Sequence, residues 1–144
     1  MKLIVNLPAF NEEEKIVSTI KRIPRNVAGV DEVFVQVIDD GSKDKTAEKA
    51  REAGADFVFS HEVNRGIGVT FRTAVEKALE NGADIMVNMD ADGQFDPNDI
   101  SKLIANPHWL GLHTLRIGAH TSTGETVFAA PAPSLRESIR KKNG

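Results

Sequence analysis

The stretch Ile85-Met86-Val87-Asn88-Met89-Asp90-Ala91-Asp92-Gly93-Gln94 decides how the rest of this 144-residue chain is understood. Its apolar start is typical of a buried β-strand, and two carboxylates one residue apart follow, then a glycine and an amide. In an open parallel sheet, ligands bind beyond the carboxyl ends of the strands. Two acids there suit a hard divalent cation that substrate phosphates also hold. Taken alone, the pair is more typical of a polar turn after a strand, because Asp-x-Asp occurs by chance in many proteins.

Composition describes an ordinary globular protein. Hydrophobic residues make up 40% of the chain and charged residues 27%, and the net charge of -3 gives no indication of a nucleic-acid surface. Cysteine is absent, which excludes disulfides and thiolate metal sites and fits a reducing compartment. No apolar run approaches the roughly 18–20 residues that a membrane span needs, and the first residues are too polar for a signal peptide. We therefore expect a cytoplasmic protein without a transmembrane segment; a peripheral position at the cytoplasmic membrane face stays open.

Short β-branched runs alternate with segments of helical periodicity from residue 3 to about residue 106. Strands are expected over residues 3–7, 33–38, 56–60 and 85–87, and Pro8 is expected to stop the first. The second has the continuous apolar pattern of a strand buried on both faces. Strands that alternate with helices predict a mostly parallel sheet covered by helices, and hence an α/β, Rossmann-like three-layer fold.

Capping signals place the helices between these strands. Asn11 is a favourable N-cap that Glu14 completes as a capping box, and Asp44 favours the start of the second helix. Asp96-Pro97-Asn98-Asp99 offers an N-cap, a proline at the first helical position and an acid in the first turn. The third helix is expected to bury an apolar stripe of Ile67, Phe71, Ala74, Val75, Ala78 and Leu79.

Three of the expected strands end in polar residues that should share one edge of the sheet. These segments are Pro8-Ala9-Phe10-Asn11-Glu12, Asp39-Asp40-Gly41-Ser42 and Asp90-Ala91-Asp92-Gly93-Gln94. Carboxylates crowded at one edge repel each other unless something cationic lies among them. Each segment alone is explained as a cap or a turn, but the three together predict a ligand site.

Three other polar residues have weaker signals. Arg65, at the start of the third helix, could contact a phosphate, although an exposed arginine at a helix start is an equally good interpretation. Arg72 is interpreted as a solvated residue on the flank of that helix. His61 is a lone histidine after a strand and is interpreted as structural.

Four motifs then occur in order: Pro-Ala-Phe-Asn-Glu-Glu after the first strand, Asp-Asp-Gly-Ser-x-Asp-x-Thr after the second, Asn-x-Gly-x-Gly before the third helix, and Met-Asp-Ala-Asp-Gly-Gln after the fourth strand. Together they resemble the nucleotide-binding half of the family-two inverting glycosyltransferases, which have the GT-A fold. The form Asp-Ala-Asp-x-Gln is most similar to the branch of the dolichol-phosphate mannose synthases. The resemblance covers residues 2 to about 106.

The resemblance implies a role for each matching residue. The loop after the first strand would border the base and ribose of the donor, and Asp40 would accept hydrogen bonds from the base while Asp39 supports the turn. The implied nucleotide-binding residues are Pro8, Phe10, Glu12, Ile38, Asp40, Asp90, Ala91 and Asp92. The implied ligands of a Mg²⁺ or Mn²⁺ cofactor are Asp90, Asp92 and Gln94. Such a cation would absorb the charge that develops on a pyrophosphate leaving group.

The composition changes near Pro107. Residues 1–107 carry 13 basic and 19 acidic side chains, whereas residues 108–144 carry 5 basic and 2 acidic ones, Glu125 and Glu137. We therefore expect a nucleotide-sugar-binding domain over 1–107 and a tail over 108–144 of uncertain structure, in which Thr126–Ala130 has strand character. The tail contains none of the family's acceptor-half motifs, and a truncation or frameshift would explain this.

The leading hypothesis is a glycosyltransferase domain that binds a nucleoside-diphosphate sugar with a divalent metal and transfers the sugar to an acceptor such as a polyprenyl phosphate. The first alternative is a truncated module that binds nucleotide without catalysis, because no carboxylate base is recognisable in the tail. The second is a receiver-like signalling domain, which is disfavoured because Pro8-Ala9, and no acidic pair, follows the first strand.

Overall fold

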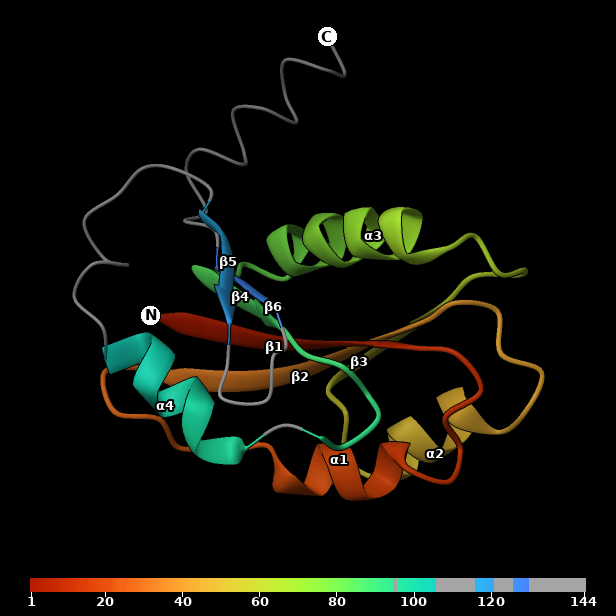
Figure 1. Ribbon diagram of the computed structural model, residues 1–144, viewed down its shortest axis with the longest axis horizontal. Coiled ribbons are helices and arrows are strands. Elements are labelled where there is room, and N and C mark those ends of the chain that lie inside the picture. The colour runs from red at the N-terminus through yellow and green to blue at the C-terminus, as the bar shows by residue number, and fades with distance from the viewer. Residues whose placement is uncertain (95, 106–115, 121–125, 130–144) are drawn as a thin grey trace, which may run out of the picture.

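The computed structural model describes residues 1–94, 96–105, 116–120 and 126–129 (Figure 1). Strands and helices alternate in the order β1 (Lys2–Ala9), α1 (Ile16–Arg22), β2 (Glu32–Asp39), α2 (Thr46–Glu52), β3 (Phe57–Ser60), α3 (Ile67–Glu80), β4 (Ile85–Asn88) and α4 (Pro97–Ala105). Two further strands, β5 (Arg116–His120) and β6 (Thr126–Ala129), follow. Among the described residues, no helix has the length and apolar character that a membrane crossing requires.

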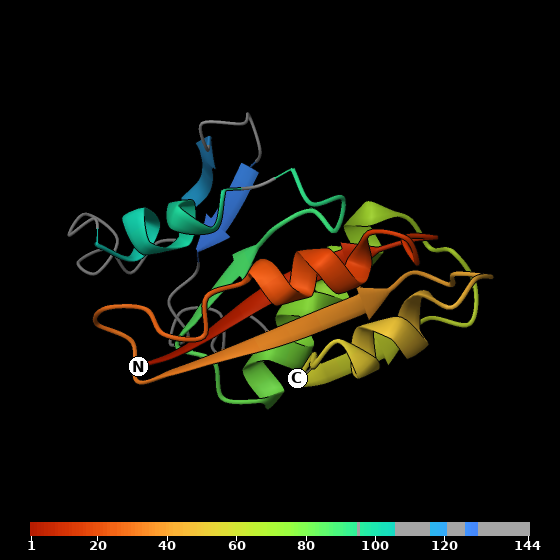
Figure 2. The same ribbon diagram turned by 90° about the horizontal axis from the view of Figure 1, so that it is seen from below.

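The first four strands form one parallel sheet in the order β3-β2-β1-β4. Helices α1, α2 and α4 cover one face of this sheet and α3 covers the other, as Figures 1 and 2 show from two directions. The predicted α/β three-layer fold with a parallel sheet is therefore confirmed. β5 and β6 pair antiparallel, which confirms the strand expected near residue 126, and β6 lies beside β4.

The core lies on both faces of the sheet because side chains alternate along each strand. On the face of α1, α2 and α4, the largest fully buried side chains are Leu3, Leu7, Ile16, Ile20, Met89 and Ile100. On the face of α3, the buried cluster consists of Ile4, Ile38, Ala74, Ala78, Ala83 and Met86. Each fully buried Leu or Ile contributes about 1.5–3 kcal/mol, so this two-sided core supports the strand ends that carry the polar segments.

A row of amide side chains ties three strands together on the α3 face. The Gln36 Nε2 group donates to Asn6 Oδ1 at 2.9 Å and to the Ala74 carbonyl at 3.0 Å. Asn6 Nδ2 in turn donates to Asn88 Oδ1 at 2.7 Å. Because Asn6 is the register partner of both Gln36 and Asn88, the row holds β2, β1 and β4 in one register just below the edge where their polar segments begin.

Pro8 does not end the first strand, contrary to expectation. β1 continues to Ala9, and Pro8 is the register partner of Ile38 on β2. The Asn6 carbonyl bonds to the β4 side and the Ala9 carbonyl to the β2 side, so by alternation the Pro8 nitrogen faces the β4 side. The β1–β4 ladder ends at Asn6, and the missing N–H of proline therefore costs no ladder bond.

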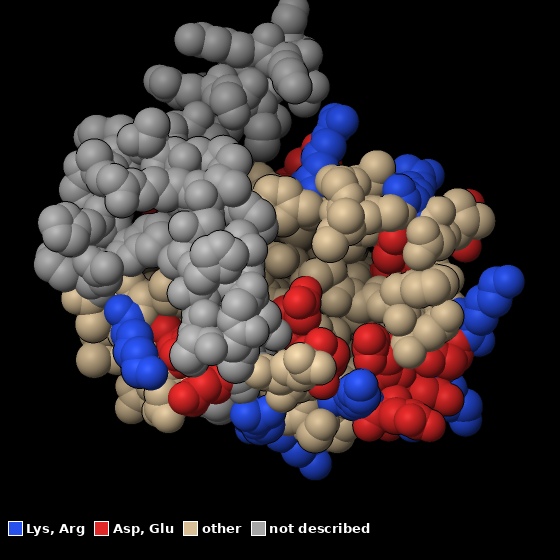
Figure 3. Space-filling model, in the orientation of Figure 1, with Lys and Arg blue, Asp and Glu red and all other residues tan. Residues whose placement is uncertain are grey.

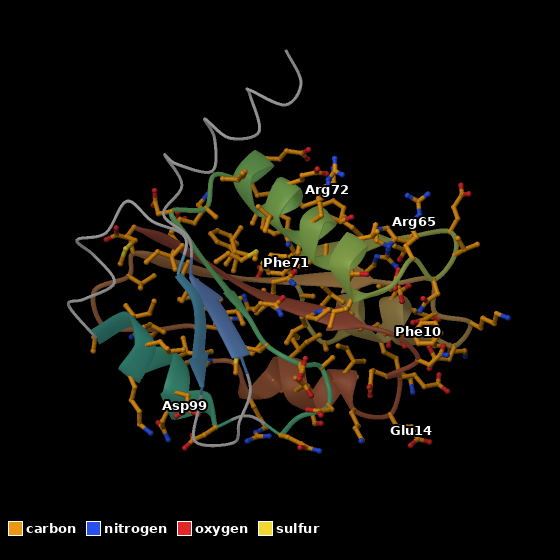
Figure 4. All side chains as sticks on the ribbon, turned by 45° about the horizontal axis from the view of Figure 1, so that its top comes forward. Phe10, Glu14, Arg65, Phe71, Arg72 and Asp99 are labelled. Atoms are coloured by element: carbon orange, nitrogen blue, oxygen red, sulfur yellow. The ribbon has the colours of Figure 1, made fainter. Side chains whose placement is uncertain are left out.

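The predicted capping box at Asn11 and Glu14 is wrong. Helix α1 begins only at Ile16, no side chain caps it, and Glu14 is exposed (Figure 4). Asn11 has a left-handed φ of 53°, and its Oδ1 accepts the Lys43 amide at 3.0 Å instead. A contact with a distant loop has thus replaced the local cap. At α4, by contrast, Asp96 Oδ1 accepts the Asn98 amide at 2.9 Å, as its capping signal predicts.

The predicted apolar stripe of α3 is only partly buried. Ala74 and Ala78 pack on the sheet, whereas Ile67 is 79% exposed. Ile67 is the first residue of the helix, and the buried residues of α3 are Thr70, Ala74 and Ala78. The sequence pattern therefore identified the buried face around Ala74 and Ala78 but wrongly extended it to Ile67.

Candidate functional site

The polar segments after β1, β2 and β4 lie at the same edge of the sheet, as the sequence analysis expected. The strands are parallel, so their carboxyl ends point the same way. From β1 the chain passes to β2 on one side, whereas β4 lies on the other side, so the strand order reverses between β1 and β4. Such a switch point is where open α/β sheets bind ligands. In Figure 3, acidic side chains gather on the side of the molecule that carries these strand ends.

Asp40, the first residue after β2, is buried and is held by several hydrogen-bond donors. Its Oδ1 accepts the Arg65 amide at 2.9 Å and lies 2.7 Å from His61 Nδ1, and its Oδ2 accepts the Gly66 amide at 2.9 Å. Burial by itself would raise the pKa of Asp40. The hydrogen bonds from His61 and from the Arg65 and Gly66 amides outweigh burial, so the pKa is lowered. Asp40 is therefore an ionised acceptor at neutral pH.

The two oxygens of Asp40 differ in their remaining capacity. A carboxylate oxygen accepts about two hydrogen bonds, and Oδ1 already accepts the Arg65 amide and faces His61. Oδ2 accepts from Gly66, while the Thr70 hydroxyl donates to the Gly66 carbonyl at 2.9 Å. A ligand N–H that binds Asp40 in this arrangement would therefore find its acceptor on Oδ2.

His61, interpreted from the sequence as structural, has both ring nitrogens in hydrogen-bond contact with neighbouring side chains. Its ring joins Asp40 to α3, because its Nε2 lies 2.9 Å from Thr73 Oγ1. The His61 amide donates to the Asp39 carbonyl at 2.8 Å, which extends the β2–β3 ladder one residue beyond β3. The sequence shows that His61 and Asp40 each come directly after a strand. Only the register Asp39↔Ser60 shows that the two are neighbours.

The turn after β2 and the loop before α3 touch at Gly41. Asp39 Oδ1 accepts the Ser42 amide at 3.1 Å, so Asp39 supports the turn, as expected. Gly41 has a left-handed φ of 74°, and a Cβ added there would overlap the Val63 carbonyl carbon and lie 2.6 Å from the Asn64 nitrogen. Only glycine allows this close approach, which positions the Arg65 and Gly66 amides over Asp40.

The loop after β1 contacts the segment after β2 at this edge. The Asn11 amide donates to Ser42 Oγ at 2.8 Å, and the Glu12 amide donates to Thr46 Oγ1 at 2.9 Å, so the segments after β1 and β2 are joined. Phe10 is 45% exposed, and Figure 4 shows it at the same edge as Arg65.

Arg72 lies away from this loop, on the exposed flank of α3. It pairs with Glu76 at 3.0 Å, as expected of a solvated residue.

Side chains of α1 hold the backbone of the acidic segment after β4 in place. Thr19 Oγ1 donates to the Ala91 carbonyl at 3.0 Å, and Arg22 Nη1 donates to the Gly93 carbonyl at 2.5 Å. Asp92 Oδ1 accepts the Gln94 amide at 3.0 Å. Asp92 therefore lies in a tight turn with one carboxylate oxygen committed to it.

The electrostatics of this pair fit a divalent cation. Partial desolvation raises the pKa of Asp90, and the negative charge of Asp92 raises it further. A cation between the two carboxylates would remove this repulsion. Within the described residues, no cluster of three or more His, Asp or Glu side chains could hold a metal by itself. The two carboxylates of Asp90 and Asp92 suit Mg²⁺ or Mn²⁺, which two carboxylates and substrate phosphates can hold together.

Two residues of the implied nucleotide site have buried side chains. Ile38 is fully buried in the cluster under α3, and Ala91 is buried in the cluster under α1. Their side chains support the site from below, and a nucleotide contact through their backbone stays a prediction. Pro8, Phe10, Glu12, Asp40, Asp90, Asp92 and Gln94 lie in or directly beside the three strand-end segments.

Comparison with known proteins gives the family. The model of glycosyl transferase family 2 matches residues 4–108. The chain belongs to this family. UDP-N-acetylglucosamine–dolichyl-phosphate N-acetylglucosaminyltransferase of Methanococcus voltae is 35% identical over 114 residues, which cover 68% of this chain and 44% of that protein. Dolichol-phosphate mannosyltransferase of Pyrococcus furiosus is 34% identical over 107 residues, covering 72% of this chain and 29% of that protein.

Solved structures agree with the family. Glucosyl-3-phosphoglycerate synthase from Mycobacterium tuberculosis, in complex with Mn²⁺, UDP-glucose and phosphoglyceric acid, superposes with a TM-score of 0.54 at 31% identity and covers 74% of this chain and 40% of that one. The expected GT-A fold and the resemblance to polyprenyl-phosphate sugar transferases are confirmed, and the receiver-like alternative is set aside. The chain spans less than half the length of each of these three proteins.

Proposed function

We propose that this chain is the donor-binding part of a glycosyltransferase and binds a nucleoside-diphosphate sugar together with Mg²⁺ or Mn²⁺. The observation that carries the proposal is the arrangement at the sheet edge. An ionised, buried Asp40 lies after β2, and the mutually repelling pair Asp90 and Asp92 follows β4, across the switch point. The N–H groups of a nucleobase need a fixed carboxylate acceptor, and a pyrophosphate needs a cation. Asp40 and the acidic pair could supply these two functions at successive positions along the edge.

The residues have separate roles in this proposal. Pro8, Phe10 and Glu12 border the base and ribose, and Asp40 accepts an N–H of the base. Asp90, Asp92 and Gln94 hold the cation, with Ala91 and Ile38 supporting the backbone around the site. The bound cation would neutralise the charge that develops on the departing diphosphate. Asp40 is buried under the β3–α3 loop, so protein donors rather than water molecules fix the orientation of its two acceptor oxygens.

The reaction of the whole family member would be a direct displacement at the anomeric carbon of the donor sugar, with a polyprenyl phosphate as the acceptor. The relatives named for dolichyl phosphate support this acceptor class. A lipid acceptor would bring the protein to the cytoplasmic membrane face as a peripheral protein. An inverting displacement also needs a base near the acceptor oxygen, and Glu125 and Glu137 lie outside the described residues. A nucleotide-binding module without transfer activity is therefore the second candidate function.

A thermal-shift panel of nucleoside diphosphates and nucleotide sugars, with and without Mn²⁺, tests the donor proposal. A ligand at 100 times its dissociation constant should stabilise the chain by about 2.7 kcal/mol. Stabilisation that requires both a diphosphate and the metal would support the proposal. An unchanged melting temperature with every nucleotide, at concentrations up to several millimolar, would contradict it.

A further inference from the structure

The His61 ring lies between the sheet and α3 at the ligand edge, and its two nitrogens face different partners. Nδ1 is 2.7 Å from Asp40 Oδ1, and Nε2 is 2.9 Å from Thr73 Oγ1. The side chain is only 12% exposed. A histidine held at both nitrogens and largely removed from water has one orientation, so it can in turn orient the group that it contacts.

The chemistry of Asp40 determines which nitrogen carries the proton. An ionised carboxylate only accepts hydrogen bonds, so the nitrogen that faces it must be protonated. His61 therefore donates from Nδ1 to Asp40 Oδ1. In the neutral ring Nε2 is then the acceptor, and the Thr73 hydroxyl donates to it.

We propose that His61 is a positioning residue for base recognition: by occupying Oδ1 of Asp40, it leaves Oδ2 as the acceptor for an imino N–H of the donor base. This inference rests on the proposed donor site. The Arg65 amide completes the acceptor capacity of Oδ1, whereas Oδ2 accepts the Gly66 amide and retains capacity for a second hydrogen bond. A carboxylate held in this way favours uracil or guanine, whose Watson–Crick edges present an N–H. It disfavours cytosine, which presents an acceptor at the equivalent ring nitrogen.

Without His61, the Asp40 carboxylate could rotate about its terminal torsion, because its remaining donors are the backbone amides of Arg65 and Gly66, which belong to one loop. A partial rotation would move Oδ2 away from the position in which it faces the base. The expected consequence is a loss of discrimination between bases, and a loss of affinity of about tenfold, comparable to one hydrogen bond to a charged group.

Three substitutions separate the two contacts of the ring. His61→Asn keeps a donor near the Nδ1 position and removes the contact with Thr73. His61→Gln keeps a polar group near the Nε2 position and removes the donor to Asp40, and His61→Leu removes both. Arg72→Gln is the matched control, because Arg72 lies on α3 but is 78% exposed and pairs with Glu76.

The experiment measures dissociation constants for UDP, GDP and CDP with Mn²⁺ on each variant of the full 144-residue chain, with circular dichroism to confirm folding. We expect His61→Leu and His61→Gln to bind the preferred nucleotide about tenfold more weakly and to lose most of the preference over CDP. His61→Asn should retain that preference, and Arg72→Gln should behave as the wild type. Unchanged or tighter binding by folded His61→Leu, with the preference intact, would overturn the inference while leaving the donor site in place.

A ligand-free measurement tests the orientation of the His61 ring separately from nucleotide binding. The ¹⁵N shifts of His61, assigned by comparison with His61→Asn, should report a proton on Nδ1. A ring protonated on Nε2 alone would overturn the inference, even if nucleotides bind. Failure of the wild type to bind any nucleotide would instead contradict the proposed function, and with it the role of His61.

Discussion

Replacing Gly41 with alanine tests whether the contact between the β2–α2 turn and the β3–α3 loop holds the candidate site together. The left-handed φ of 74° costs an alanine about 1–2 kcal/mol. The new methyl group would also overlap the Val63 carbonyl carbon and lie 2.6 Å from the Asn64 nitrogen, both of which are backbone atoms that cannot move aside as a side chain can. Overpacking of this kind costs about a further 1–3 kcal/mol.

Gly29→Ala is the matched control for this change. Gly29 has a similar φ of 81°, but a Cβ there would meet nothing within 4 Å. Urea unfolding of the two variants should therefore show a loss of about 1–2 kcal/mol for Gly29→Ala and about 2–5 kcal/mol for Gly41→Ala. The difference isolates the contact with the loop from the cost of the backbone conformation.

The same variant has a functional consequence. Moving the loop away from Gly41 would shift the Arg65 and Gly66 amides, which bond to Asp40 at 2.9 Å each. We expect Gly41→Ala to weaken nucleoside-diphosphate binding in a thermal-shift titration, while Gly29→Ala leaves it unchanged. Equal destabilisation of the two variants, together with equal nucleotide affinity, would refute the argument that this contact positions the loop over Asp40.

Three further predictions concern charge and catalysis. Asp92→Asn should abolish the gain in nucleoside-diphosphate affinity that Mn²⁺ provides, and should bring the raised pKa of Asp90 down, as a carboxyl-detected NMR titration would report; an unchanged metal dependence would count against the pair as ligands. Because the pKa of folded Asp40 is lowered from 3.8, its ionised form contributes stability that is present above pH 3.8 and is lost as the pH falls through the folded pKa. Urea unfolding of the wild type between pH 5 and 2 should show that loss, and Asp40→Asn should show a shallower one; parallel curves would contradict the assignment. Finally, the 144-residue chain, incubated with labelled nucleotide sugars and polyprenyl phosphates, should transfer sugar slowly or not at all, because donor binding alone does not stabilise the transition state. Robust metal-dependent turnover would show that residues 108–144 do supply a working acceptor site.

The sequence by itself determined the α/β class, the number of parallel strands in the main sheet and the edge at which the polar segments meet. These features depend on local periodicity and on chain order. Strands that alternate with helices must run parallel, and parallel strands place all their carboxyl ends together. The segments after β1, β2 and β4 could therefore be assigned to one edge without knowing which strands are neighbours. The family resemblance rested on the same local segments.

Other features were decided only by tertiary structure, because they depend on the register between segments distant in the chain. Pro8 fits inside β1 because β4 leaves the ladder at Asn6. Asn11 does not cap α1, because its side-chain oxygen accepts the backbone amide of Lys43 from the loop after β2. His61 meets Asp40 because β3 pairs with β2 at Asp39↔Ser60. A shift of one residue in that pairing would turn the side chains to the other face of the sheet, and no local pattern in the sequence specifies it.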